Sequence, residues 1–198
     1  MQTTSQAIKA YAEALPEGAT LSARELLHLG ERAAVDQALS RLVRRGELLR
    51  VRRGLFALPM KTRFGSRAPS VEAVVEHIAK STGERVSQSG ASAANLLGIS
   101  TQNPSRQVYW TSGPSRHLKL GAQSVELKHV PSWQLRAPNS RAGYAFRALA
   151  YFGKSEAAQA VRRIKATLNE EEKRELLSLR ASAPTWMAKE LSALAPSQ

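Results

Sequence analysis

The fold of the N-terminal part is decided by residues 22–58, which read SARELLHLGERAAVDQALSRLVRRGELLRVRRGLFAL. Ser22 and Glu25 have the spacing of a capping box, in which each side chain accepts a hydrogen bond from the other residue's backbone N–H. Leu21 and Leu26 flank them at the positions of a hydrophobic staple. This pattern predicts a short helix that begins directly after the serine.

A second, longer helix is predicted from Glu31 to Arg45, and Gly46 ends it, because glycine readily adopts the left-handed conformation that follows a helix. Its apolar stripe consists of Val35, Ala38, Leu39 and Leu42. Two helices joined by a tight turn form a helix-turn-helix, whose second helix enters the major groove of DNA. An amphipathic helix precedes them, with an apolar face of Ile8, Tyr11, Ala12 and Leu15.

Two β-leaning runs follow the second helix, Leu48–Val51 and Leu55–Leu58, on either side of Arg52-Arg53-Gly54. The glycine supplies the positive φ that a tight hairpin turn requires. A β-hairpin in this place is the wing of a winged helix. We therefore predict a winged helix-turn-helix DNA-binding domain over residues 1–60.

The charge of the chain points to a polyanionic partner. Its 198 residues include 29 Lys and Arg against 16 Asp and Glu, a net charge of +13. Between Arg41 and Arg67 the only acidic residue is Glu47, among nine basic residues. Nucleic acid is the usual partner of such a patch, while solubility or anionic lipid are the alternatives.

We expect eight residues to contact DNA: Gln37, Ser40, Arg41, Arg44, Arg45, Arg50, Arg52 and Arg53. Gln37 suits adenine, and Arg41 or Arg44 suits guanine O6 and N7. The other arginines suit phosphates or the minor groove, because the tip of a β-hairpin lies along the DNA backbone. The alternative for the glutamine and the serine is simple solvation.

The rest of the chain is predicted to be a basic linker at 61–69 and an α+β domain at 70–198. The linker cations either follow a groove as an extended arm or are simply solvated. A helix begins after Ser70, and a small-residue helix, Ala91–Leu97, ends at Gly98. The strands of a small antiparallel sheet are Val108–Thr111, Leu118–Leu120 and Val125–Val130. Four flanking helices are expected at about 141–152, 155–168, 170–181 and 185–194.

The sequence offers little for catalysis. It contains no cysteine, its four histidines are dispersed, and neither a P-loop nor a nucleophile elbow occurs. We therefore expect no catalytic residues, no metal and no cofactor. No apolar run is long enough to cross a membrane, and no secretory signal precedes the first helix, so we expect a cytoplasmic protein.

Several motifs of the second part resemble the AbiEi family of antitoxins and transcriptional regulators. They are Ser89-Gly90, Ala93–Gln102, Thr111–Gly113, Leu118–Gly121 and Pro184–Met187. The most specific of them is the Ala-Ala-Asn-Leu-Leu-Gly stretch with its Ser-Thr-Gln tail.

The resemblance implies a type IV toxin–antitoxin system of abortive infection. In that family an N-terminal winged helix represses the operon's own promoter, and the C-terminal domain counters a nucleotidyltransferase-like toxin. Two alternatives stay open. One is a stand-alone winged-helix regulator, and the other is a nucleic-acid-modifying enzyme that uses the C-terminal domain.

Overall fold

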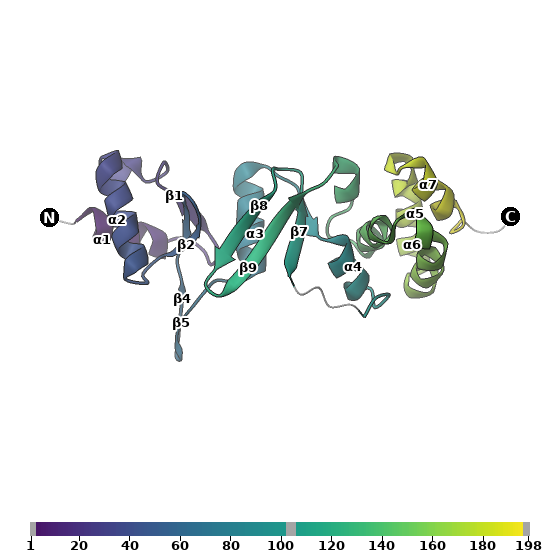
Figure 1. The fold of residues 1–198 in the computed structure, drawn as a ribbon, viewed down its shortest axis with the longest axis horizontal. Coiled ribbons are helices and arrows are strands. Elements are labelled where there is room, and N and C mark those ends of the chain that lie inside the picture. The colour runs from purple at the N-terminus through teal and green to yellow at the C-terminus, as the bar shows by residue number, and fades with distance from the viewer. Residues whose placement is uncertain (1–2, 102–105, 196–198) are drawn as a thin grey trace. The chain divides into compact units, whose positions relative to one another are not determined.

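The computed structural model of the chain describes residues 3–101 and 106–195. It consists of α-helices and small antiparallel sheets (Figure 1), so the predicted α+β class is confirmed. The chain divides into two compact units. The first contains the described residues up to Glu84 together with His117–Val125, and the second contains Arg85–Arg116 and the residues from Glu126 onward.

The first unit is built around a three-stranded sheet in the order β1-β3-β2. Its elements are α1 (Thr4–Glu13), β1 (Thr20–Ser22), a 3₁₀ helix (Leu27–Leu29), α2 (Arg32–Arg44), β2 (Leu49–Arg52), β3 (Leu55–Ala57), β4 (Met60–Thr62), β5 (Gly65–Arg67) and α3 (Val71–Thr82). Helices α1 and α2 pack against each other (Figure 1). Ile8, Leu26 and Leu39 are fully buried between these elements, as their spacing predicts.

The segment after Ser22 differs from the prediction, because it forms turns and one 3₁₀ helix instead of an α-helix. Both capping-box bonds are present, from Ser22 N to Glu25 Oε2 at 2.8 Å and from Glu25 N to Ser22 Oγ at 3.4 Å. Ser22, however, is also the last residue of β1, where it pairs with Leu55. The segment is too short to repay helix nucleation, and turns suffice to bury Ala23 and Leu26.

Part of the expected basic linker at 61–69 is a second β-hairpin, formed by β4 and β5. Its register pairs Met60 with Arg67 and Thr62 with Gly65. The hairpin projects away from α1, α2 and the β1-β3-β2 sheet (Figure 1). Since residues 61–67 are all exposed, they lack the apolar alternation by which a strand is recognised.

Helix α3 groups with the first unit, although we expected the C-terminal domain to begin at residue 70. Ser70 caps the helix by accepting a hydrogen bond from Ala73 N at 3.2 Å. From β1, Thr20 N donates to His77 Nδ1 at 3.1 Å. Gly18 lies so close to the Ala73 backbone that a Cβ there would be 2.6 Å from the Ala73 carbonyl carbon. These contacts attach the helix to β1.

The second unit contains the remaining elements: β6 (Val86–Gln88), α4 (Gly90–Leu96), β7 (Gln107–Thr111), most of β9 (Gln123–His129), a 3₁₀ helix (Ser132–Leu135), α5 (Arg141–Thr167), α6 (Glu170–Ser178), a 3₁₀ helix (Leu179–Ser182) and α7 (Thr185–Ser192). Strand β8 (Arg116–Leu120), which apart from Arg116 is grouped with the first unit, is the last strand of a four-stranded sheet in the order β6-β7-β9-β8. The three predicted strands are confirmed, and β6 is an addition.

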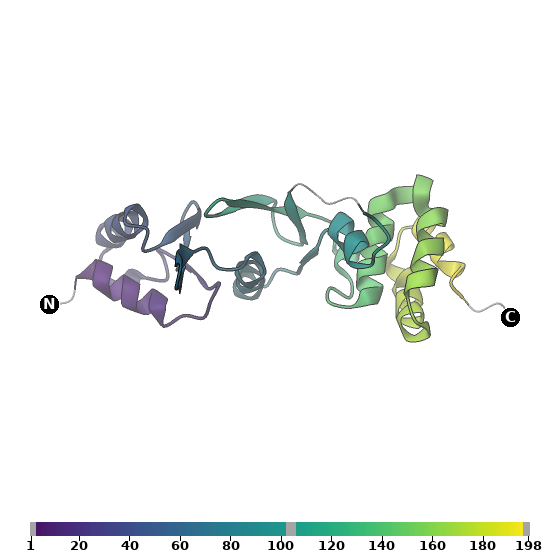
Figure 2. The ribbon, with the colours of Figure 1, turned by 90° about the horizontal axis from the view of Figure 1, so that it is seen from below.

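The helices of the second unit follow the predicted segments. Gly153, at φ 72° and ψ −177°, interrupts α5, which bends sharply there (Figure 2), so the separation of 141–152 from 155–168 is confirmed. Asn169 and Glu172 cap α6 reciprocally, with bonds of 2.8 and 3.0 Å. The acidic start of this helix therefore lies where the helix dipole favours it.

The small-residue motif at 93–102 packs within the second unit. Ala93 and Ala94 are fully buried, and α4 crosses α5 closely. A Cβ on Gly90 would lie 2.5 Å from the Arg147 carbonyl oxygen. The motif's last residue, Gln102, lies outside the described residues.

Arg147 is the largest fully buried side chain of the second unit. Its guanidinium donates to the carbonyl oxygens of Arg136 at 3.2 Å and Pro138 at 2.8 Å, and lies 5.2 Å from the centre of the Tyr144 ring. Burial lowers its pKa to about 10. Between the two carbonyls, Ala137 has a φ of 45°, which costs energy in a residue with a Cβ. The guanidinium therefore fastens a strained loop to α5.

Candidate nucleic-acid interface

The C-terminal end of α2 determines where the arginines lie. Glu47 N donates to Leu42 O at 2.9 Å and Gly46 N donates to Val43 O at 3.0 Å, the two bonds of a Schellman motif. Gly46 has the φ of +70° that this motif requires. The chain thereby turns out of the helix and directly into β2.

One face of α2 presents polar side chains to solvent. Gln37 and Arg44 are exposed and Ser40 is half-buried, at the spacing of three and four residues that aligns side chains on a helix. Among the described residues none of these three side chains has a hydrogen-bond or ion-pair partner. The helix's own ion pair, Arg32 Nε to Asp36 Oδ2 at 2.8 Å, lies nearer its start.

Arg41 and Arg45 line a separate hollow of about 420 Å³ between α1 and the end of α2. Lys9 of α1 lies on the same hollow, and its Nζ is 2.6 Å from Glu47 Oε2. This hydrogen bond lowers the pKa of Glu47 and raises that of Lys9. The only acidic side chain between Arg41 and Arg67 is therefore ionised and already paired.

The predicted wing is the hairpin of β2 and β3. Arg52 and Arg53 are exposed at its tip, where Gly54 has a φ of +74°, and neither arginine has an ion-pair partner among the residues described. Arg50 is different, because its guanidinium lies 5.7 Å from the ring centre of its cross-strand partner Phe56. Arg50 therefore covers a core residue as well as carrying charge.

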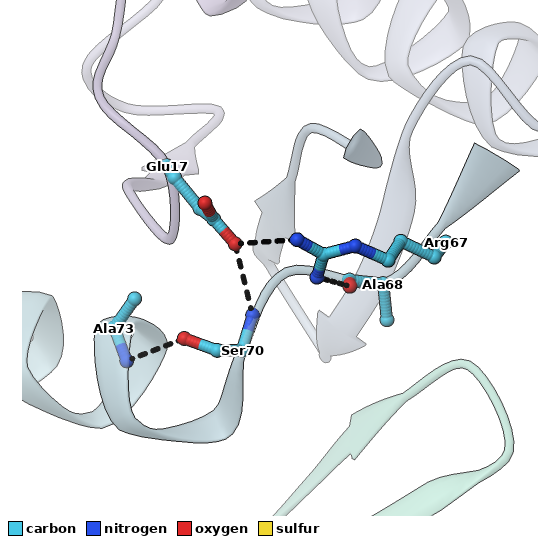
Figure 3. Close-up of polar contacts among 5 residues, drawn as sticks. All are labelled: Glu17, Arg67, Ala68, Ser70 and Ala73. Carbon is cyan, nitrogen blue, oxygen red and sulfur yellow. Dashed lines mark hydrogen bonds and ion pairs between the residues drawn. The ribbon is translucent and has the colours of Figure 1, made fainter. Parts of the chain in front are cut away.

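The second hairpin also carries basic residues. The sequence left two interpretations of these cations, an extended arm that follows a groove or a solvated linker. Lys61 Nζ lies 3.9 Å from Glu13 Oε1 of α1. Arg67, at the base of β5, donates through Nη2 to Glu17 Oε1 at 3.5 Å and through Nη1 to Ala68 O at 3.1 Å (Figure 3). The same carboxylate oxygen accepts a bond from Ser70 N at 3.4 Å. Arg67 therefore belongs to a set of polar contacts with Glu17 and Ala68 at the base of the hairpin.

The predicted site residues consequently fall into groups. Gln37, Ser40 and Arg44 share the exposed helix face, Arg41 and Arg45 share the hollow, Arg52 and Arg53 share the hairpin tip, and Arg50 stands apart on Phe56. Sequence reasoning did not include Lys9, which is more than 30 residues before its partners. The sequence did contain a signal for Lys9, because this residue lies next to Ile8, which is on the apolar face of the first helix.

Metal and membrane sites are not observed in the described part of the chain. Within residues 3–101 and 106–195 no group of three or more His, Cys, Asp or Glu side chains is arranged to hold a metal ion. None of the helices in these ranges combines the length and apolar character needed to span a bilayer.

Comparisons with known proteins find a structure of similar fold and a protein family. The structure is similar to the crystal structure of the RV2827C protein from Mycobacterium tuberculosis, with a TM-score of 0.52 and 17% sequence identity, over 96% of this chain and 75% of that one. At this identity the likeness concerns the fold alone. No curated protein matches the sequence. A family model described as a family of unknown function, DUF6088, matches residues 7–176. The chain belongs to this family.

Proposed function

We propose that the chain is a cytoplasmic double-stranded-DNA-binding protein, and that its first unit is a winged-helix variant. The order α1-β1-turn-α2-β2-β3 supports this reading, with the turn and 3₁₀ helix in place of the helix that usually precedes the recognition helix. Helix α2 is then the reading element, and the hairpin of β2 and β3 is the wing.

The observation that carries the proposal is an uncompensated set of arginines. Arg44 on the helix face and Arg52 and Arg53 on the hairpin tip have no ion-pair partner within the described residues, and the nearby Glu47 is paired with Lys9. An exposed arginine that has no acidic partner can pair with an external anion, and a phosphate backbone supplies such anions at regular spacing.

The first prediction concerns the salt dependence of binding to duplex DNA. If six to eight phosphates are neutralised, the slope of log K against log salt concentration should be about −5 to −7, at about 0.9 per phosphate. Fluorescence anisotropy of a labelled duplex over a salt series measures it. A slope near zero, or no binding at low salt, contradicts the proposal.

The second prediction concerns the wing. Arg52→Ala with Arg53→Ala should weaken binding to a selected site and to random duplex equally, and should reduce the salt slope by about two, because phosphate contacts carry no sequence information. The matched control, Arg162→Ala with Lys165→Ala, removes the same charge from exposed positions on α5. An equal loss in the control would assign the effect to overall charge instead.

We further propose, on the resemblance to AbiEi antitoxins, that the bound DNA is the chain's own promoter and that the second unit opposes a nucleotidyltransferase-like toxin. The second unit can oppose the effect of the toxin without binding the toxin directly. The burial of Ala93 and Ala94 supports a role of their motif in holding the second unit together.

A further inference from the structure

The tip of the second hairpin, between β4 and β5, carries an aromatic side chain in solvent. Phe64 is 85% exposed, the largest exposed fraction among the large hydrophobic residues described. The register pairs Thr62 with Gly65, so the loop consists of Arg63 and Phe64 alone. A phenylalanine in this position contributes nothing to the core.

The loop holds this ring in a defined place. Thr62 Oγ1 donates to Gly65 O at 2.8 Å and accepts from Phe64 N at 3.3 Å. Gly65 has a φ of +114°, which favours glycine. The Arg63 guanidinium carbon lies 4.6 Å from the centre of the Phe64 ring. The two side chains therefore form one stacked unit at the tip.

The base of the hairpin is fixed as well. Glu17 joins Arg67 to the first residue before α3 (Figure 3), and Pro59 and Pro69 are buried on either side of the strands. The hairpin is therefore held to the first unit at its base, while its tip lies in solvent. The strands and their loop contain Lys61, Arg63 and Arg67 and no acidic residue, which suits a polyanion.

We propose that this hairpin is a second DNA contact of the first unit, and that Phe64 inserts between adjacent base pairs from the minor groove. The inference rests on the proposed DNA binding. Apolar side chains on minor-groove binders act as such wedges, and an arginine beside the wedge suits the negative potential of that groove. The exposed ring gains a stacking partner, and the arginine gains phosphates.

The test uses the full chain and duplexes in which 2-aminopurine replaces adenine at successive positions of a selected site. Wild-type protein should raise the fluorescence at one base step, because unstacking relieves the quenching of this base. Phe64→Ala should abolish that rise and weaken binding by about 10-fold, the order expected for loss of one stacking contact. Phe64→Leu, which keeps an apolar wedge, should retain most of both.

Two further variants separate the contributions. Arg63→Ala should lower the salt slope by about one, whereas Phe64→Ala should leave the slope unchanged, since it removes no charge. Leu96→Ala removes another exposed hydrophobic side chain, 56% exposed on α4, and should change neither affinity nor fluorescence. Since Phe64 lies outside the core, its variants should unfold at the wild-type denaturant concentration.

The outcomes distinguish the two proposals. If wild-type protein binds duplex but no position shows unstacking, or if Phe64→Ala binds as tightly as wild type, the wedge is overturned and DNA binding stands. In that case the exposed Phe64 side chain would be assigned to a contact with a protein partner. If wild-type protein does not bind duplex at all, the proposed function itself fails.

Discussion

Arg41→Ala combined with Arg44→Ala is expected to weaken binding to a selected duplex by about 30-fold or more, because a bidentate guanine contact of Arg44 is worth about 1–3 kcal/mol and Arg41 adds a contact that all sequences share. The single variants should differ. Arg44 lies on the solvent face with Gln37 and should relax specificity at one base, whereas Arg41 lines the hollow with Lys9 and should weaken all sequences. Competition binding against single-base variants of the site measures both. Equal losses on every sequence for Arg44→Ala would remove α2 as the reading element.

In cells the same double variant is expected to lose repression and yet protect against the toxin, if the second unit carries the antitoxin role. Neither arginine belongs to that unit. A reporter on the chain's own promoter measures repression, and growth with the toxin expressed from an unrelated promoter measures protection, at matched protein levels. A folded double variant that no longer protects would show that DNA binding is itself the antidote.

Arg147→Ala is expected to lower the free energy of unfolding by about 3–5 kcal/mol, because it opens a cavity and leaves the carbonyls of the Arg136–Pro138 loop with fewer donors. Arg147→Met should cost less than alanine, since both remove the buried charge but methionine also fills the space that alanine leaves open. Urea unfolding monitored by tryptophan fluorescence gives the ranking.

The surface variant Arg162→Ala serves as the control for this series and should change stability by less than about 0.5 kcal/mol. A cost below about 1 kcal/mol for Arg147→Ala would mean that the loop relaxes without the guanidinium, and that the hydrogen bonds at 3.2 and 2.8 Å contribute little.

The sequence predicted the elements whose apolar residues repeat with a helical or strand period. Helix α2, helix α3 and the hairpin of β2 and β3 are of this kind, and so are the helices on either side of Gly153. Strand β1 has three residues, and residues 61–67 of the second hairpin are all exposed, so neither has an apolar period to detect. The Ser22–Glu25 box formed its bonds without a helix, because the same two bonds also stabilise a turn.

The candidate site was predictable as a set of charges but not as an arrangement. A basic run can be recognised from composition, whereas the pairing of Glu47 with Lys9 depends on how α1 packs on α2. The stacking of Arg50 on Phe56 depends in the same way on cross-strand register. Such contacts depend on how helices pack and on strand register, which the pattern of a single sequence does not determine.

The hairpin of β4 and β5 also has a consequence for solubility. It is a two-stranded sheet to which no third strand is added within the described residues, so backbone N–H and C=O groups are left unpaired along its edges. Open edges of this kind join to one another and cause aggregation, and lysine or arginine side chains prevent this by repulsion. We expect Lys61 in β4 and Arg63 in the adjoining loop to hinder association between copies of the chain in this way. Removing both charges should make the protein self-associate as its concentration rises.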